Sequence, residues 1–109
     1  MISVKVQKKD DFYTGFEVLG HSDYAESGKD IVCSAVSILA YTLLNSINII
    51  GEIDENNIMI EENEKDGLLT AKIEEYNIKT NLLFDNFLIG IELLKEDYSE
   101  YITLKHEEV

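Results

Sequence analysis

Arginine, tryptophan and proline are all absent from this 109-residue chain, and lysine supplies its nine cations. Asp and Glu together number 22, so the formal net charge is −13. Because affinity for nucleic-acid backbones and for anionic membrane surfaces comes from Lys and Arg, this composition argues strongly against both kinds of partner. A basic protein partner is compatible with the charge, although solubility alone would also explain it.

The chain is also poor in cysteine, because Cys33 is the only one. A single cysteine excludes an internal disulfide and favours a reducing compartment. The first residues lack the basic and apolar regions of a signal peptide. The longest apolar region, residues 31–50, is interrupted by Ser, Thr and Asn, so no run approaches the ~20 apolar residues of a membrane span. A cytoplasmic protein is therefore expected.

Sequence patterns for metal ions and phosphate-bearing cofactors are missing as well. Cys33, His21 and the distant His106 lack the spacing of a structural zinc site, and there is no phosphate-binding glycine loop. His106 lies among charged residues near the end of the chain and is interpreted as a solvated tail residue. We therefore expect neither a metal ion nor a cofactor.

Apolar residues make up 45% of the chain, which is enough for a hydrophobic core, and the length fits one domain over residues 1–109. Alternation with a period of two predicts strands, and apolar residues three and four apart predict helices. The predicted strands cover residues 2–7, 12–20, 58–60, 69–73 and 101–105, and the predicted helices cover residues 30–50 and about 77–96.

The predicted order of elements is β-β-α-β-β-α-β, which is typical of an α+β fold. Short turns at residues 8–11 and at Asp66-Gly67 predict antiparallel hairpins. Both amphipathic helices would then pack on one face of a mostly antiparallel sheet. The other face of the sheet needs either polar residues or cover, which a homodimer could supply.

One apolar stripe defines the first helix, which Gly51 would end. Its members are spaced three or four residues apart and are Val32, Val36, Leu39, Leu43, Ile47 and Ile50. The polar segment before the helix, residues 21–30, has no hydrophobic periodicity and is predicted to be a mobile loop. It could be a flap over a site or an ordinary connection between a strand and a helix.

Cys33 would lie in the first turn of this helix. A helix N-terminus carries about half a positive charge, which favours the thiolate, the nucleophilic form of cysteine. The alternative is a small apolar residue that fills space on the buried face. His21 favours the first interpretation, because it stands at a strand end that could adjoin the helix start. Its imidazole could take the thiol proton and return it to a leaving amine, although it could also be a surface histidine.

Three further residues have two interpretations each. Asp30 could only cap the helix, or it could also orient His21 as a third catalytic member. Ser37, one turn after Cys33, could hold a water or a substrate group, or it could simply allow close packing. Gly20 could permit a positive φ or the close approach of a substrate. Free backbone N–H groups at the helix start are candidates for an oxyanion hole.

The residues around this candidate pair resemble a known family. The signature of the bacterial ribosomal-processing cysteine proteases (the Prp or YsxB-like family) is similar to two segments, Gly20-His21-Ser22-Asp23-Tyr24-Ala25 and Gly28-Lys29-Asp30-Ile31-Val32-Cys33-Ser34-Ala35-Val36-Ser37. The resemblance covers the whole chain, including its small size, the order of its elements and the ending at residues 101–104.

This resemblance implies a cysteine endopeptidase that removes a short N-terminal extension from a protein of the large ribosomal subunit, cutting after a pair of aromatic residues. It implies a small homodimer with His21 as general base and Cys33 as nucleophile. The family's essential glycine, aspartate and serine match Gly20, Asp30 and Ser37. The loop of residues 22–29 would be a flap that becomes ordered on substrate.

Two positions in the loop depart from the family. Ser22 and Ser27 stand where a small apolar residue and a bulkier residue are more usual, so fine substrate preference stays open. The main alternative function is a non-catalytic module for ribosome assembly that binds a basic ribosomal protein. A thiol redox sensor is a third hypothesis, which the lack of a resolving cysteine disfavours.

Overall fold

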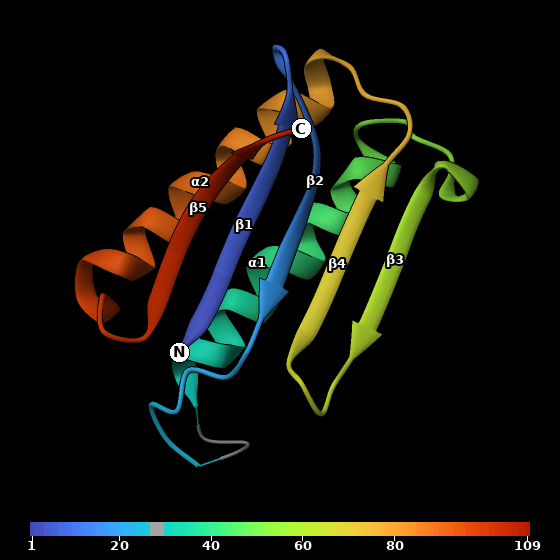
Figure 1. Cartoon of the computed structure of the whole chain (residues 1–109). Helices are drawn as coiled ribbons and strands as arrows, with labels where there is room; N and C mark the ends of the chain where they lie inside the picture. The colour runs from blue at the N-terminus through green and yellow to red at the C-terminus, as the bar shows by residue number, and fades with distance from the viewer. Residues whose placement is uncertain (27–29) are drawn as a thin grey trace.

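The computed structural model describes residues 1–26 and 30–109, and its elements follow the predicted order (Figure 1). The strands and helices are β1 (Ile2–Lys9), β2 (Phe12–Leu19), α1 (Ile31–Ile49), β3 (Ile58–Asn63), β4 (Leu68–Ile73), α2 (Ile78–Tyr98) and β5 (Ile102–Glu108). A short 3₁₀ helix, Glu55–Asn57, lies in the connection between α1 and β3.

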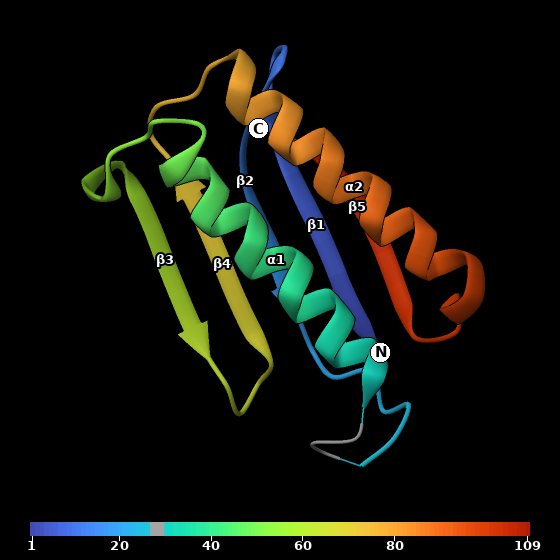
Figure 2. The same cartoon turned by 180° about the vertical axis from the view of Figure 1, so that it is seen from behind.

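The strands form a single five-stranded sheet in the order β3-β4-β2-β1-β5. Three neighbouring pairs are antiparallel, whereas β5 runs parallel to β1. Two opposite views show both helices on one face of this sheet (Figure 1 and Figure 2). The predicted α+β fold with a mostly antiparallel sheet is therefore confirmed.

The sheet face away from the helices is polar at its centre. Lys5 of β1 lies 3.5 Å from a carboxylate oxygen of Glu17 in β2 and 3.3 Å from one of Glu107 in β5. The hydrogen bond and charge of Glu107, followed by those of Glu17, raise the pKa of Lys5. The sequence analysis left open whether this face is polar or covered by another chain. Its centre is polar.

The hydrophobic core lies between the sheet and the two helices. The buried residues of α1 are Val32, Val36, Ala40, Leu43, Leu44 and Ile47, and those of α2 are Thr80, Phe84, Phe87 and Ile91. The predicted stripe is therefore confirmed except at its end. Ile50 is 53% exposed because α1 has already ended and Ile50 is its C-cap.

Within the described part of the chain, α1 is the one helix long and apolar enough to cross a membrane, with a mean hydropathy of 1.6. Its Ser, Thr and Asn residues therefore interrupt the apolar run less than the sequence analysis supposed. Helices at the core of a soluble domain pass the same test. The six buried residues of α1 are core residues of this domain, so packing accounts for its inward side, whereas Ile38 and Ile49 on its outer side are exposed.

Several strands are longer than predicted, because each continues as far as a neighbouring strand offers backbone partners. Lys8 and Lys9 pair with β2 and so belong to β1, where a turn was predicted. β3 pairs with β4 as far as Asn63, and β5 pairs with β1 as far as Glu108. His106 consequently lies in the sheet opposite Val6. The prediction of a tail at His106 is wrong, although its side chain is exposed as expected.

Candidate active site

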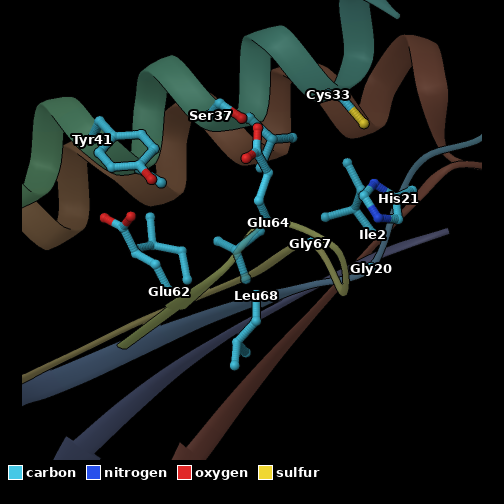
Figure 3. Close-up of a pocket in the computed structure, with 14 residues that line it drawn as sticks. Ile2, Gly20, His21, Cys33, Ser37, Tyr41, Glu62, Glu64, Gly67 and Leu68 are labelled. Carbon is cyan, nitrogen blue, oxygen red and sulfur yellow. The ribbon is translucent and has the colours of Figure 1, made fainter. Parts of the chain in front are cut away.

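A cavity of about 450 Å³ lies between α1, the end of β2 and the β3–β4 hairpin (Figure 3). The α1 side contributes Cys33 and Ser37, and the segment that follows β2 contributes Gly20 and His21. Four of the five predicted site residues thus line the same cavity. The fifth, Asp30, directly precedes α1.

Asp30 is the N-cap of α1, as predicted. Its Oδ1 accepts hydrogen bonds from the backbone N–H groups of Val32 and Cys33, each with an N–O distance of 3.0 Å. This arrangement satisfies donors that a helix start otherwise leaves unpaired. It also means that these two N–H groups are already occupied by Asp30, so the oxyanion donors stay unassigned.

The second carboxylate oxygen of Asp30 binds the loop before the helix. Oδ2 accepts a hydrogen bond from the Ser22 hydroxyl and, at 3.2 Å, one from the Tyr24 N–H. Burial by itself would raise the pKa of Asp30, but hydrogen bonds from Ser22 and from backbone N–H groups hold the pKa below its usual value. Among the described residues no hydrogen bond joins Asp30 to His21, so an orienting role stays a prediction.

The sulfur of Cys33 is half-buried in the first turn of α1. Sγ lies 3.4 Å from both the N–H and the Oγ of Ser22, and the Cys33 side chain also contributes to the hydrogen bonding that lowers the pKa of Asp30. Figure 3 shows the sulfur pointing to the side of the cavity where the His21 ring lies. Cys33 therefore faces the cavity, as a nucleophile requires, and its sulfur hydrogen-bonds to the residue after His21.

Gly20 turns the chain at the end of β2. Its φ is 99°, and a Cβ atom there would lie 2.5 Å from the carbonyl oxygen of Met1, so glycine is required both by the dihedral angle and by the available space. His21 follows, and its Nε2 lies 3.1 Å from the carbonyl oxygen of Lys65. A carbonyl only accepts hydrogen bonds, so Nε2 carries the hydrogen and the neutral ring keeps its lone pair on Nδ1.

The turn between β3 and β4 is part of the site that the sequence analysis missed. Gly20 N–H lies 3.2 Å from the carbonyl oxygen of Gly67, which ties this turn to the end of β2. A Cβ atom on Gly67 would come within 3.2 Å of the His21 ring, so glycine lets the ring lie against the turn. The Asp66-Gly67 signal correctly predicted a turn, but no local signal says that it folds back onto β2.

The far end of the cavity is acidic. Tyr41 of α1 and Glu62 of β3 lie there, and Glu64 lies nearer to Ser37 (Figure 3). Burial, then the charge and hydrogen bond of Glu62, then the charge of Glu64 raise the pKa of the Tyr41 hydroxyl. The carboxylates of Glu62 and Glu64 therefore both act on the Tyr41 hydroxyl, on one wall of the cavity.

The described part of the loop before α1 is anchored. Ser22 is 2% exposed, and the ring of Tyr24 packs edge-on against Tyr98 and Tyr101 with centroid distances of 5.5 and 5.2 Å. Residues 27–29, which include Ser27 and Gly28, lie outside the described residues. The flap therefore stays a prediction.

Comparisons with known proteins address the class of enzyme. A family model described as cysteine protease Prp matches residues 1–103. The ribosomal processing cysteine protease Prp of Bacillus subtilis is 23% identical over 90 residues, which is 78% of each chain. A protein of the same name from Staphylococcus aureus strain Mu50 is 26% identical over 88 residues, which is 81% of each chain.

Solved structures agree with this result. SMU.848 from Streptococcus mutans is 30% identical with a TM-score of 0.82, and the match covers 100% of this chain and 96% of that one. The essential ribosomal processing protease Prp from Staphylococcus aureus, solved with a covalently linked product peptide, is 28% identical with a TM-score of 0.84. That match covers 98% of this chain and 100% of the other.

A thiol and an imidazole that line one cavity at the start of a helix are the groups that a cysteine hydrolase needs. With a family model that matches residues 1–103, the chain belongs to the Prp family of cysteine proteases. The resemblance and the enzyme class inferred from the sequence are thereby confirmed.

Proposed function

We propose that this chain is a cytoplasmic endopeptidase that removes the short N-terminal extension of a large-subunit ribosomal protein, cutting after aromatic residues. The relatives named for ribosomal processing support this substrate class, as does the Staphylococcus aureus structure with its covalently linked product peptide. The observation that carries the proposal in this chain is that Cys33 and His21 line the same cavity.

In the proposed reaction, Nδ1 of His21 takes the proton from Sγ of Cys33, and the sulfur attacks the carbonyl carbon of the scissile bond. The C–N bond then breaks, and the imidazolium gives its proton to the leaving amine. A water that loses a proton to His21 hydrolyses the thioester, which releases the carboxylate product and the free thiol. The carbonyl of Lys65, which binds Nε2–H, would orient the ring and stabilise its charged form.

The remainder of the cavity suits a peptide with both aromatic and basic side chains. Leu68 and Leu69 provide apolar surface, and Glu62 and Glu64 provide two carboxylates that would attract a Lys or Arg side chain. Ser37 lines the cavity one turn after the nucleophile, where it would hold a water or a substrate group. The net charge of −13 adds a long-range attraction for a basic ribosomal protein.

The test is incubation of the extended ribosomal protein, or of a peptide that spans its junction, with the wild type and with Cys33→Ala and Cys33→Ser. We expect cleavage by the wild type, none by Cys33→Ala and almost none by Cys33→Ser, because a hydroxyl is a much weaker nucleophile. Ser34→Ala is the matched control and should stay active. Unchanged cleavage by Cys33→Ala would reject the mechanism, and tight binding without cleavage by the wild type would favour a non-catalytic binding module.

We also propose that the chain functions as a homodimer. The 19 residues of α1 include no charged residue, and its outward side chains Ile38 and Ile49 are 65% and 73% exposed. Two copies that each carry a charge of −13 repel one another least through such an uncharged face. Sedimentation should give a dimer for the wild type and a monomer for Ile38→Glu, and a monomeric wild type at micromolar concentration would contradict the proposal.

A further inference from the structure

The side chain of Ser22 lies at the centre of a hydrogen-bonded chain that the reaction above does not use. Ser22 is 2% exposed, so water does not compete for its hydroxyl. The hydroxyl donates to Oδ2 of Asp30 and lies 3.4 Å from Sγ of Cys33. The backbone N–H of Ser22 lies at the same distance, 3.4 Å, from the same sulfur.

The direction of each hydrogen bond follows from counting protons. An ionised carboxylate only accepts, so the single hydroxyl proton of Ser22 points to Asp30. The N–H of Tyr24 already donates to Oγ of Ser22 at 3.3 Å. The lone pair that remains on Oγ faces the sulfur, so the thiol of Cys33 is the donor in that contact. Hydrogen bonds that hold the pKa of Asp30 low keep this direction at neutral pH.

We propose that the Ser22 hydroxyl is a positioning group that holds the resting Cys33 as a protonated thiol. To form the thiolate, the S–H must leave Oγ and transfer its proton to His21, and the anion then faces an oxygen lone pair. The N–H of Ser22 stays on the sulfur and stabilises the anion. The hydroxyl of Ser22 thus opposes ionisation of the Cys33 thiol, whereas the backbone N–H of Ser22 favours it.

Other charged groups act on the same sulfur and remain in place when the hydroxyl is removed, although Asp30 loses the hydrogen bond that Ser22 donates to it. His21 lies at the end of β2 and favours the thiolate when it is protonated. Asp30 precedes α1, and Glu62 and Glu64 line the cavity from β3 and its turn, so all three carboxylates oppose the thiolate. Ser22→Ala keeps every one of these groups, and Asp30 keeps its hydrogen bonds from the N–H groups of Val32 and Cys33, so the main change at the sulfur is loss of the hydroxyl acceptor.

The experiment measures the rate of Cys33 alkylation by iodoacetamide as a function of pH. In Ser22→Ala we expect the midpoint of this profile to fall by about half to one pH unit, the size expected for one neutral hydrogen bond. Ser34→Ala is the matched control, because the Ser34 hydroxyl donates to the backbone carbonyl of Asp30 at 3.0 Å, whereas the hydrogen bonds described for the sulfur involve Ser22. A midpoint that stays or rises in a Ser22→Ala protein with a cooperative melting curve would overturn the proposal.

Asp30→Asn provides a second variant, which also serves if Ser22→Ala does not fold. The amide would donate to Oγ of Ser22 and free the hydroxyl proton to turn to the sulfur, and loss of the nearby carboxylate charge acts in the same direction. The midpoint should therefore fall again, and an unchanged or higher midpoint counts against the proposal. In the double variant the fall caused by Asp30→Asn should shrink, because no hydroxyl is left to turn. If Asp30→Asn lowered the alkylation midpoint equally in the wild type and in Ser22→Ala, the proposed role of the Ser22 hydroxyl would be contradicted.

The consequence for turnover rests on the proposed function: peptide cleavage by Ser22→Ala should persist to lower pH than cleavage by the wild type. Alkylation reports on the thiol whether or not a peptide is cut. Failure to cleave by every variant, including the wild type, would reject the proposed protease substrate and leave the alkylation result standing. A shifted cleavage profile with an unshifted alkylation profile would reject the role of Ser22.

Discussion

The two ends of the cavity differ in how their side chains are held. At the reactive end, half-buried Cys33 is bound by Ser22, and His21, although exposed, is held by the carbonyl of Lys65, so each group has a fixed neighbour. At the acidic end, Glu62 and Glu64 are exposed side chains near an edge of the sheet. Fixed groups suit chemistry, which depends on sub-ångström geometry, whereas exposed charges suit attraction, which acts over several ångströms.

We expect the largest effect on cleavage from replacement of His21 at the reactive end of the cavity. His21→Ala should lower kcat by about 10²- to 10⁴-fold, because it removes the proposed general base. The measurement is the pH dependence of peptide cleavage at saturating substrate. His106→Ala is the matched control, since this exposed histidine lies in β5. Equal activity of His21→Ala and His106→Ala would show that His21 is not the general base.

Gly20→Ala should have the next largest effect, and it acts on the fold first. The variant would need a left-handed backbone and would bring Cβ within 2.5 Å of the Met1 carbonyl, so we expect a loss of at least ~1–2 kcal/mol in the free energy of unfolding. Chemical denaturation measures this loss. Leu19→Ala, at a neighbouring and partly exposed position, should lose less, and a larger loss there would refute the backbone argument.

Asp30→Ala should lower the free energy of unfolding by about 1 kcal/mol at pH 7, because α1 loses its N-cap. The folded-state pKa of Asp30 lies below its usual value of 3.8. Its contribution is therefore fully present above pH 3.8 and is lost as the pH falls through the folded-state pKa. Denaturation at pH 7 and at pH 3 should show the difference between wild type and variant narrowing in acid, and a constant difference would contradict this assignment.

The smallest effect is expected at the acidic end. Glu62→Gln with Glu64→Gln should raise KM for a lysine-containing peptide by only a few-fold and leave kcat unchanged, because exposed charges contribute little to binding. A peptide with norleucine in place of lysine is the matched control and should show no change. A loss of kcat in the double variant would show that these carboxylates act on the chemistry.

Much of this site was predictable because its signals are local. The helix start at Asp30 and the position of Cys33 in the first turn depend on residues within a few positions along the chain. The positive φ of Gly20 is likewise local, whereas its lack of space for a Cβ atom comes from distant Met1. The stripe of α1 was also correct up to Ile47, since helical periodicity alone fixes which side is buried. The error at Ile50 concerns where the helix ends, which packing and capping decide.

Other parts of the site depend on contacts between distant segments. The partner of His21 is Lys65, 44 residues away, and the sulfur of Cys33 binds Ser22, 11 residues away. No periodicity or turn signal pairs such residues. The sequence left open whether Asp30 only caps the helix or also orients His21, and it gave no hint that the carbonyl oxygen of Lys65 would lie 3.1 Å from Nε2 of His21.

By itself, the sequence determined the elements, their order and the chemical types at the site, because hydrophobic periodicity, capping residues and glycine signals act over a few residues. Tertiary structure alone decided that the β3–β4 turn closes on β2, that two carboxylates share the cavity with the thiol, and which groups bind the sulfur and the imidazole. The physical reason is that hydrogen bonds between segments far apart in the chain depend on how the sheet pairs and where the helices pack on it.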